Sequence, residues 1–373
     1  MRPDLFAAAL VVAGLAASTT LAAEASRAPY GVMASGAPVE VFTLKNNRGM
    51  SVKVLSLGGI ITQINVPDRK GEVRNVVLEL ADLQAYEAKP FFSSLLGRYA
   101  NRISGGGFTL DGVRHDLPSG PEGISSHGGP TSMAKQVWTG TPFQRRGEAG
   151  VTLTYVAADG EGGYPGALKV SVTYTVTANN ALRIDYQATT DKPTVLNLSH
   201  HAYFNLAGGG TIYDQTVQVL AKSFTPIDAR KLAIGTVAPV AGTGLDLRQA
   251  TRLGDAVAAD DPQIKLGAGL DHNFVVDGGG RGKLVLAVRM RDPASGRTLD
   301  VRTTQPGVQL FTANSFNGSL KTPDGRPLEK GAGLAIETQH FADSPNHPNF
   351  PTTVLRPGQV FRETTEFRFG TSK

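Results

Sequence analysis

Short segments in which apolar and polar residues alternate recur from residue 39 to residue 369 of this chain. Alternation with a period of two is typical of strands that bury one face. Turn-forming residues separate the segments, since the chain contains 44 Gly and 22 Pro. The pattern predicts an all-β fold, a large antiparallel β-sandwich with few short helices. The expected strands cover residues 39–44, 51–57, 60–66, 108–110, 113–115, 151–156, 168–176, 182–188, 283–290, 298–303, 308–312, 334–337 and 364–369.

Local signals refine this expectation. Asp111-Gly112 stands between two strand-like segments and predicts a two-residue hairpin turn. Short helices are expected over residues 82–89 and 229–233 and near Ala256. The glycine-rich pieces are short and no composition shift divides the chain, so one large domain over residues 26–373 is the simplest interpretation.

The first 25 residues have the pattern of a secretory signal peptide. Arg2 is followed by an apolar run over residues 5–15 and then by the small residues Ala22, Ala23 and Ala25. An uncleaved membrane anchor is the alternative, but the run is shorter than the ~20 apolar residues that a spanning helix needs. We therefore expect residues 1–25 to be removed and the protein to be periplasmic or secreted, with no membrane segment after cleavage.

Composition excludes several classes of function. The chain has no cysteine, which excludes disulfides, thiol nucleophiles and thiolate metal sites. Its net charge is +5, but the basic residues are scattered, so no nucleic-acid partner is expected. The sequence contains no P-loop, dinucleotide fingerprint or Gly-x-Ser-x-Gly motif. Nothing in the sequence sets the oligomeric state.

The segment over residues 197–206 concentrates groups that can exchange protons. It holds His200 and His201 in a chain with only seven histidines. An imidazole pKa of about 6.5 suits proton transfer near neutral pH. Because neighbouring strand residues face opposite sides, His201, Tyr203 and Asn205 are expected to share one face. This more polar face is the better candidate for a site, and a hydrogen-bonded core histidine is the alternative.

Two further segments carry polar groups suited to a hydroxyl-rich ligand. Asn101 and Arg102 lie near the end of segment 97–103, and a guanidinium offers several donors in a fixed fork. A surface loop whose arginines pair with carboxylates is the alternative. His127 precedes two glycines, in a tight loop where a ligand can approach the backbone closely. A turn histidine that faces solvent would explain the same pattern.

Carboxylates occur in two strand-like segments. Asp271 and His272 are adjacent in a short apolar segment, where a ligand-binding role and a structural role fit equally. The spacing typical of a metal site is missing, so no metal is expected. Glu337 ends an apolar strand, where partial burial would raise its pKa from about 4.3 toward the range of a general base. A strand-end glutamate that faces water is the alternative.

These segments occur in the same order as the motifs of the aldose 1-epimerases, also called mutarotases. The chain resembles that family over nearly all of its length, from about residue 39 to residue 369. Each match is weak alone, but seven matches in order are not expected by chance. The matching segments are residues 97–103, ending in Asn-Arg-Ile, His127-Gly128-Gly129, Gly163-Tyr164-Pro165-Gly166, His201-x-Tyr-Phe-Asn-Leu, Leu270-Asp271-His272-Asn273-Phe274, Pro306-Gly307-Val308-Gln309 and Glu337-Thr338-Gln339.

The resemblance implies a galactose mutarotase-like β-sandwich with a site in the concave face of one sheet. It also implies a cofactor-free interconversion of the α and β anomers of aldohexoses such as galactose and glucose. By position, Glu337 resembles the general base that removes the anomeric hydroxyl proton, and His201 resembles the general acid that protonates the ring oxygen. His127 resembles a second histidine near that oxygen. The groups that would hold the sugar hydroxyls are Asn101, Arg102, Asp271 and Gln309.

The implied activity agrees with the chemistry of the residues. Opening a hemiacetal needs one acid and one base, and no electron or phosphate carrier. A sugar site also needs an aromatic face, which Tyr203 and Phe204 or Trp138 could supply. Two alternatives stay open. A sugar-phosphate epimerase on the same fold would need extra cations at the pocket rim. A non-catalytic carbohydrate-binding protein would need no acid–base pair.

Overall fold

The computed structural model of the protein describes residues 23–120, 122–145 and 147–372. Most of its regular structure is β-strand, and neighbouring strands in the sheets pair antiparallel, which confirms the predicted fold class. The expected signal peptide lies outside the described residues except for its last three positions. Of these, Glu24 and Ala25 begin strand β1 (Glu24–Val32) and pair with β2, so this sheet starts inside the segment assigned to the leader.

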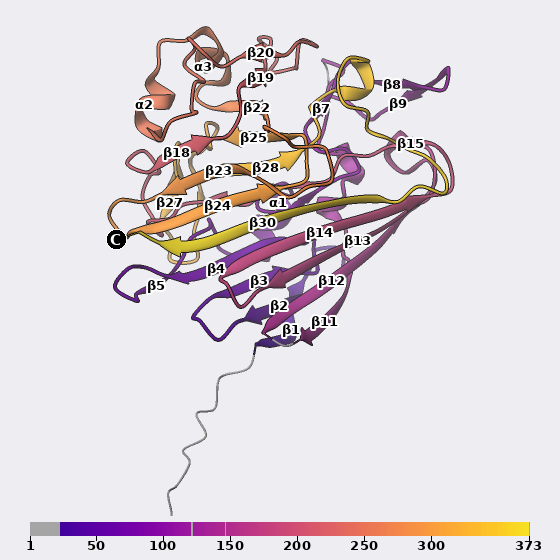
Figure 1. Cartoon of the computed structure of the whole chain (residues 1–373). Helices are drawn as coiled ribbons and strands as arrows, with labels where there is room; N and C mark the ends of the chain where they lie inside the picture. Colours follow the sequence, from indigo (N-terminus) through magenta and orange to yellow (C-terminus); the bar gives the residue numbers. More distant parts are fainter. Residues whose placement is uncertain (1–22, 121, 146, 373) are drawn as a thin grey trace, which may run out of the picture.

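A nine-stranded sheet runs across the molecule from the magenta strands β11–β14 to the orange strands β23 and β24 (Figure 1). The last long strand, β30, lies at its centre between β14 and β24, so the C-terminal segment joins the two halves of the sheet. In spatial order the strands are β11 (Thr139–Arg145), β12 (Glu148–Ala157), β13 (Leu168–Val176), β14 (Ala181–Thr190), β30 (Phe361–Thr371), β24 (Arg297–Thr303), β23 (Val285–Arg291), β18 (Thr216–Val219) and β21 (Thr251–Arg252).

Two further sheets complete the sandwich. The five-stranded sheet contains β1, β2 (Pro38–Lys45), β3 (Ser51–Leu55), β4 (Ile61–Pro67) and β5 (Val73–Asn75). The six-stranded sheet contains, in spatial order, β17 (Tyr203–Phe204), β28 (Leu334–Gln339), β25 (Gly307–Phe311), β22 (Asp271–Val275), β19 (Ser223–Thr225) and β20 (Ala238–Pro239). The two-stranded pairs are β6 (Leu95–Leu96) with β16 (Ser199–His200), β7 (Arg102–Ile103) with β10 (Ser125–Ser126), β8 (Gly107–Leu110) with β9 (Val113–Asp116), β15 (Thr194–Val195) with β29 (Val354–Leu355), and β26 (Asn317–Lys321) with β27 (Pro327–Glu329).

The main hydrophobic core lies between the nine-stranded sheet and the other two. Phe42 of β2, Val172 of β13, Val301 of β24 and Ile336 of β28 are all fully buried in this one cluster. Each comes from a segment of alternating polarity, so burying every second side chain satisfies the pattern seen in the sequence. The sheet side opposite the core is therefore free to carry polar groups.

Helices are few and short, as predicted: α1 (Leu83–Ala88), α2 (Leu253–Ala258) and α3 (Pro262–Gly267). Single 3-10 turns span Gly129–Thr131, Met133–Lys135, Glu161–Gly163 and Ser344–Asn346. Helix α1 confirms the expectation over residues 82–89, and the carboxylate of Asp82 caps its first turn. Among the described residues, no helix combines the length and the hydropathy that crossing a membrane requires.

Other local expectations had mixed outcomes. The Asp111-Gly112 hairpin is confirmed, and both residues have the positive φ that such a turn requires. The helix predicted over residues 229–233 is wrong. There, Asp228 accepts the backbone N–H groups of Arg230 and Leu232, which closes a turn instead.

Candidate functional site

One face of the six-stranded sheet carries several of the polar residues predicted from the sequence. Leu334 and Ile336 of β28 are buried in the core, so Glu337 lies on the opposite face. The strand register places Gln309 of β25 directly beside Glu337. The Gln309 side-chain amide donates to Oδ1 of Asp271, in β22, across 2.6 Å. Alternation and register together bring these three polar side chains side by side.

Loops over this sheet face supply the other predicted residues. Asn101 and Arg102 come from the start of β7, His127 follows β10, and His201 lies between β16 and β17. All seven predicted site residues line one cavity of about 210 Å³. This volume is below the ~300–1,000 Å³ of drug-sized ligand pockets and suits one small polar ring. The seven residues are Asn101, Arg102, His127, His201, Asp271, Gln309 and Glu337.

Glu337 and His201 form a buried pair within the cavity. Oε1 of Glu337 lies 3.3 Å from Nε2 of His201, and the two side chains are 2% and 8% exposed. Burial raises the pKa of Glu337 well above its ordinary value, and the charge of Asp271 raises it further. Burial lowers the pKa of His201 to about 4. Both groups are favoured in their neutral forms, and transfer of one proton from the carboxyl group to the imidazole creates a base and an acid.

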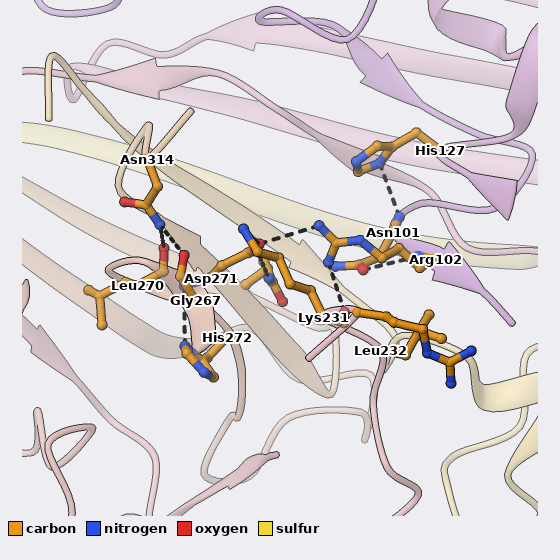
Figure 2. Close-up of polar contacts among 12 residues, drawn as sticks. Asn101, Arg102, His127, Lys231, Leu232, Gly267, Leu270, Asp271, His272 and Asn314 are labelled. Atoms are coloured by element: carbon orange, nitrogen blue, oxygen red, sulfur yellow. Dashed lines mark hydrogen bonds and ion pairs between the residues drawn. The ribbon is translucent and has the colours of Figure 1, made fainter. Parts of the chain in front are cut away.

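His127 is held in a defined tautomer. The backbone N–H of Asn101 donates to Nδ1 of His127 across 3.1 Å (Figure 2). The backbone N–H of His127 donates to the Asn101 carbonyl. A neutral imidazole whose Nδ1 accepts a hydrogen bond carries its proton on Nε2. Burial lowers the pKa of His127 well below its ordinary value, so the ring is neutral near pH 7. His127 is therefore a hydrogen-bond donor and not a base at this site.

The Nε2–H tautomer of His127 also affects whether this site can bind a metal ion. The ligand atoms of His127, His201 and Glu337 lie within 4.8 Å of one another, close enough to suggest a cation site. A metal needs an unprotonated ring nitrogen, but Nδ1 of His127 is engaged and Nε2 carries the proton. Asp271 and His272, the other ligand candidates, point to opposite faces of β22 (Figure 2). These donor sets fit proton transfer better than metal coordination.

Arg102, Lys231 and Gln309 surround the buried carboxylate of Asp271. Nη2 of Arg102 lies 3.3 Å and Nζ of Lys231 lies 3.8 Å from Oδ2 of Asp271. Nη1 of Arg102 also donates to the Lys231 carbonyl, so Arg102 bridges the carboxylate and the loop (Figure 2). Lys231 was not among the residues predicted from the sequence. A lysine in a turn carries no signal of its own, and only the folded loop brings it to Asp271.

Aromatic rings form part of the cavity wall. Phe91, Tyr203 and Phe311 line it. The ring centres of Phe91 and His127 are 5.1 Å apart, and those of Tyr203 and His201 are 4.8 Å apart. Tyr203 therefore lies where the sequence predicted an aromatic face. Phe91 and Phe311 were missed, because one follows a helix and the other ends a strand, in patterns that core residues also show.

Three other sequence expectations for this site are wrong. Phe204 lies on the opposite side from Tyr203 and packs in the main core. Trp138 is also buried in that core, and its indole N–H donates to the Met133 carbonyl. Asn205 was expected to share a face with His201, but the strand ends at Phe204. The Asn205 side chain donates instead to the backbone carbonyls of Gly209, Gly210 and Ala332.

The buried carboxyl of Glu337 should lower the stability of the fold as the pH rises. Its pKa is raised in the folded state from 4.5, so the folded protein binds this proton more tightly than the unfolded chain. The stabilisation is complete below about pH 4.5 and is lost as the pH rises through the folded pKa. We expect Glu337→Gln to be more stable than wild type at pH 8, and this advantage should shrink as the pH falls toward 4.5. Thermal unfolding between pH 4 and pH 9 measures the stability difference between the two proteins. A stability difference that does not change with pH would contradict a raised pKa of Glu337.

Known proteins are similar to this chain over most of its length. A family model described as aldose 1-epimerase matches residues 40–368, a range that contains all seven site residues. Galactose mutarotase from Mus musculus is 42% identical over 348 residues, which cover 92% of this chain and 98% of the relative. Aldose 1-epimerase from Escherichia coli (strain K12) is 34% identical, over 90% of this chain and 96% of the relative. The crystal structure of galactose 1-epimerase from Lactobacillus acidophilus superposes with a TM-score of 0.83 at 29% identity, covering 94% of this chain and all of that chain.

Proposed function

The chain belongs to the aldose 1-epimerase family, and from this premise we propose that Glu337 and His201 are the base and the acid of its reaction. The protein is an isomerase that interconverts the α and β anomers of aldoses. The observation that carries the proposed roles is the 3.3 Å separation of Glu337 Oε1 and His201 Nε2 in a buried cavity. A proton can pass between a sugar and either group without crossing bulk water.

Ring opening uses both members of the pair. The Glu337 carboxylate takes the proton of the anomeric hydroxyl, and the electrons of that O–H bond form the aldehyde C=O bond. The bond between C1 and the ring oxygen breaks, and its electrons go to the ring oxygen, which takes a proton from Nε2 of His201. The products are the open-chain aldose, a neutral carboxyl group and a neutral imidazole, which are the forms that burial favours.

Ring closure reverses these transfers on the other face of the aldehyde. After rotation about the C1–C2 bond, His201 takes the proton of the sugar hydroxyl while that oxygen attacks C1. Glu337 returns its proton to the former carbonyl oxygen, which completes the opposite anomer. The oxidation level of C1 is the same in the hemiacetal and the aldehyde, so the cycle needs no electron carrier. The pair ends in its starting protonation state and is ready for another turnover.

The cavity also suits a free aldohexose such as galactose or glucose as the substrate. His127 offers a fixed Nε2–H donor, and Arg102, Asn101, Gln309 and Asp271 offer donors and acceptors for hydroxyl groups. A phosphorylated sugar is the alternative, because Lys231 adds a second cation beside Arg102. Both cations already contact the Asp271 carboxylate, which reduces their attraction for a phosphate.

Polarimetry separates these substrates and tests for turnover. Freshly dissolved α-D-galactose, α-D-glucose and α-D-glucose 6-phosphate are followed with and without the purified protein. We expect faster decay of optical rotation for the free hexoses, and the faster of the two identifies the preferred sugar. Acceleration of the phosphate alone would support a sugar-phosphate epimerase. Binding of hexose without any acceleration would support a non-catalytic carbohydrate-binding protein.

Asp271→Asn should weaken sugar binding and turnover together. The change removes the charge that holds Arg102 and keeps only an amide beside Gln309. Hydrogen bonds to charged groups contribute about 1.5–3 kcal/mol, so kcat/KM should fall about 10- to 100-fold. Initial rates over a range of galactose concentrations measure this value. Asp185→Asn, which breaks a more exposed pair with Arg183, serves as control and should stay within about twofold of wild type. Equal effects of the two substitutions would contradict a substrate-binding role for Asp271.

Export to the periplasm or the medium is also proposed, from the signal-peptide pattern over residues 1–25. Because β1 begins at Glu24, cleavage just before that residue would keep the whole strand in the mature protein. N-terminal sequencing of protein recovered from the extracellular and periplasmic fractions tests this. An intact Met1 on protein found only in the cytoplasm would contradict export.

A further inference from the structure

A row of buried polar side chains crosses the six-stranded sheet beside the proposed catalytic pair. Gln339 of β28, Asn273 of β22 and Thr225 of β19 are each no more than 2% exposed. Nε2 of Gln339 donates to Oδ1 of Asn273, and Nδ2 of Asn273 donates to Oγ1 of Thr225, each across 3.4 Å. Gln339 lies two positions after Glu337, so the row shares the sheet face of the cavity.

Gly307 makes room for this row. It pairs directly with Gln339 across the β25–β28 ladder, and the Asn273 side chain lies over it. A Cβ atom at Gly307 would lie 2.4 Å from Oδ1 of Asn273, which is far inside van der Waals contact. The backbone of Gly307 is not left-handed, so its conformation would allow other residues. Space for the Gln339–Asn273 hydrogen bond is the physical reason for a glycine here.

The row ends at Asn101, and this end fixes the direction of its hydrogen bonds. Oδ1 of Asn101 accepts the backbone N–H of Arg102 across 3.0 Å, so its Nδ2 must face the row. That Nδ2 donates to Oε1 of Gln339 across 3.4 Å. Gln339 therefore presents its own Nε2 to Asn273. The hydrogen-bond partners of Asn101, Gln339 and Asn273 therefore determine which side-chain atom of each amide is the oxygen and which is the nitrogen.

Asn101 in turn holds His127. Both residues have a left-handed backbone, with φ of 67° and 51°, a conformation that is uncommon for non-glycine residues, although Asn and His adopt it more often than most. In this conformation the Asn101 backbone N–H points to Nδ1 of His127. We propose that Gln339, Asn273 and the gap at Gly307 form a positioning relay that holds Asn101 in place and thereby fixes His127 as the Nε2–H tautomer. The inference rests on the proposed function, in which that Nε2–H donates to the sugar.

The tautomer of His127 can be measured without substrate. In protein labelled with ¹⁵N at histidine, the ring nitrogens of His127 are assigned by their loss in His127→Gln. We expect a pure Nε2–H pattern in wild type and a mixture of both tautomers in Gln339→Met, which fills the same space without polar atoms. Gly307→Ala should give the same mixture while Gln339 is still present. For both variants kcat/KM should fall about tenfold.

A matched control distinguishes an effect on the relay from the general effect of removing a buried amide side chain. Gln305 is also fully buried, and its side chain donates to the Leu198 carbonyl across 3.0 Å, outside the relay. Gln305→Met should keep the Nε2–H pattern of His127. A wild-type pattern in both Gln339→Met and Gly307→Ala overturns the relay, whatever their rates. Because the pattern is read without turnover, an inactive wild type would overturn the proposed function and leave this test intact.

Discussion

Glu337→Gln is expected to lower kcat for anomer interconversion by about 10²- to 10⁴-fold, the usual contribution of a general acid or base. Glutamine keeps the shape and can still accept a hydrogen bond, but it cannot take the proton of the anomeric hydroxyl. In the proposed cycle that proton must leave before the ring can open. KM should change little, because the groups proposed to hold the sugar hydroxyls are untouched.

The chain offers a close control for this substitution. Glu363 lies 3.5 Å from Nε2 of His340, and both side chains are mostly buried, so it forms a second His–Glu pair away from the cavity. Glu363→Gln should leave kcat within about twofold of wild type, as expected for a pair that does not touch substrate. Thermal unfolding of both variants establishes that they are folded. A Glu337→Gln enzyme with near-normal kcat would remove Glu337 from the role of base.

His201→Asn is expected to lower kcat by a similar factor, about 10²- to 10⁴-fold, because the ring oxygen then leaves without a proton donor. The more informative result comes from the double variant with Glu337→Gln. Acid and base act in the same step, so once one is missing the other has little left to contribute. We expect the double variant to be no more than about tenfold slower than the slower single variant.

Independent action would give a different result for the double variant. If Glu337 and His201 each stabilised the rate-limiting transition state independently of the other, their effects on free energy would add and the fold-losses would multiply. Polarimetric rates of wild type, both single variants and the double variant complete the cycle. His340→Asn provides the histidine control from the second His–Glu pair. Multiplied losses would contradict the coupled proton transfer described above.

The fold class could be predicted because alternation is a local property of the chain. Ile336 and Glu337 are neighbours in a strand, so one must face the core when the other faces the site. The same rule placed His201 and Tyr203 at one cavity. The helix expected over residues 229–233 failed because the Asp228 side chain competes for the backbone N–H groups that a helix would need.

The parts of the site that were missed depend on packing between distant segments. Lys231 reaches Asp271 only because its loop is tied to Arg102. Phe91 reaches His127 only because the chain after α1 folds over the sheet. Helix α3 was also missed, although Asp261 before Pro262 is a standard helix start and could have been found.

Exchange NMR of galactose at anomeric equilibrium is the most direct test of the central claim, that Glu337 and His201 interconvert anomers by proton transfer. Galactose labelled with ¹³C at C1 gives separate signals for the α and β forms, and their exchange cross-peaks report the interconversion rate without an initial anomeric excess. With a small fraction of wild-type protein, dialysed against a chelator, we predict strong cross-peaks that disappear when Glu337→Gln replaces it. Cross-peaks of equal strength with both proteins, or none with folded wild type, would contradict the account.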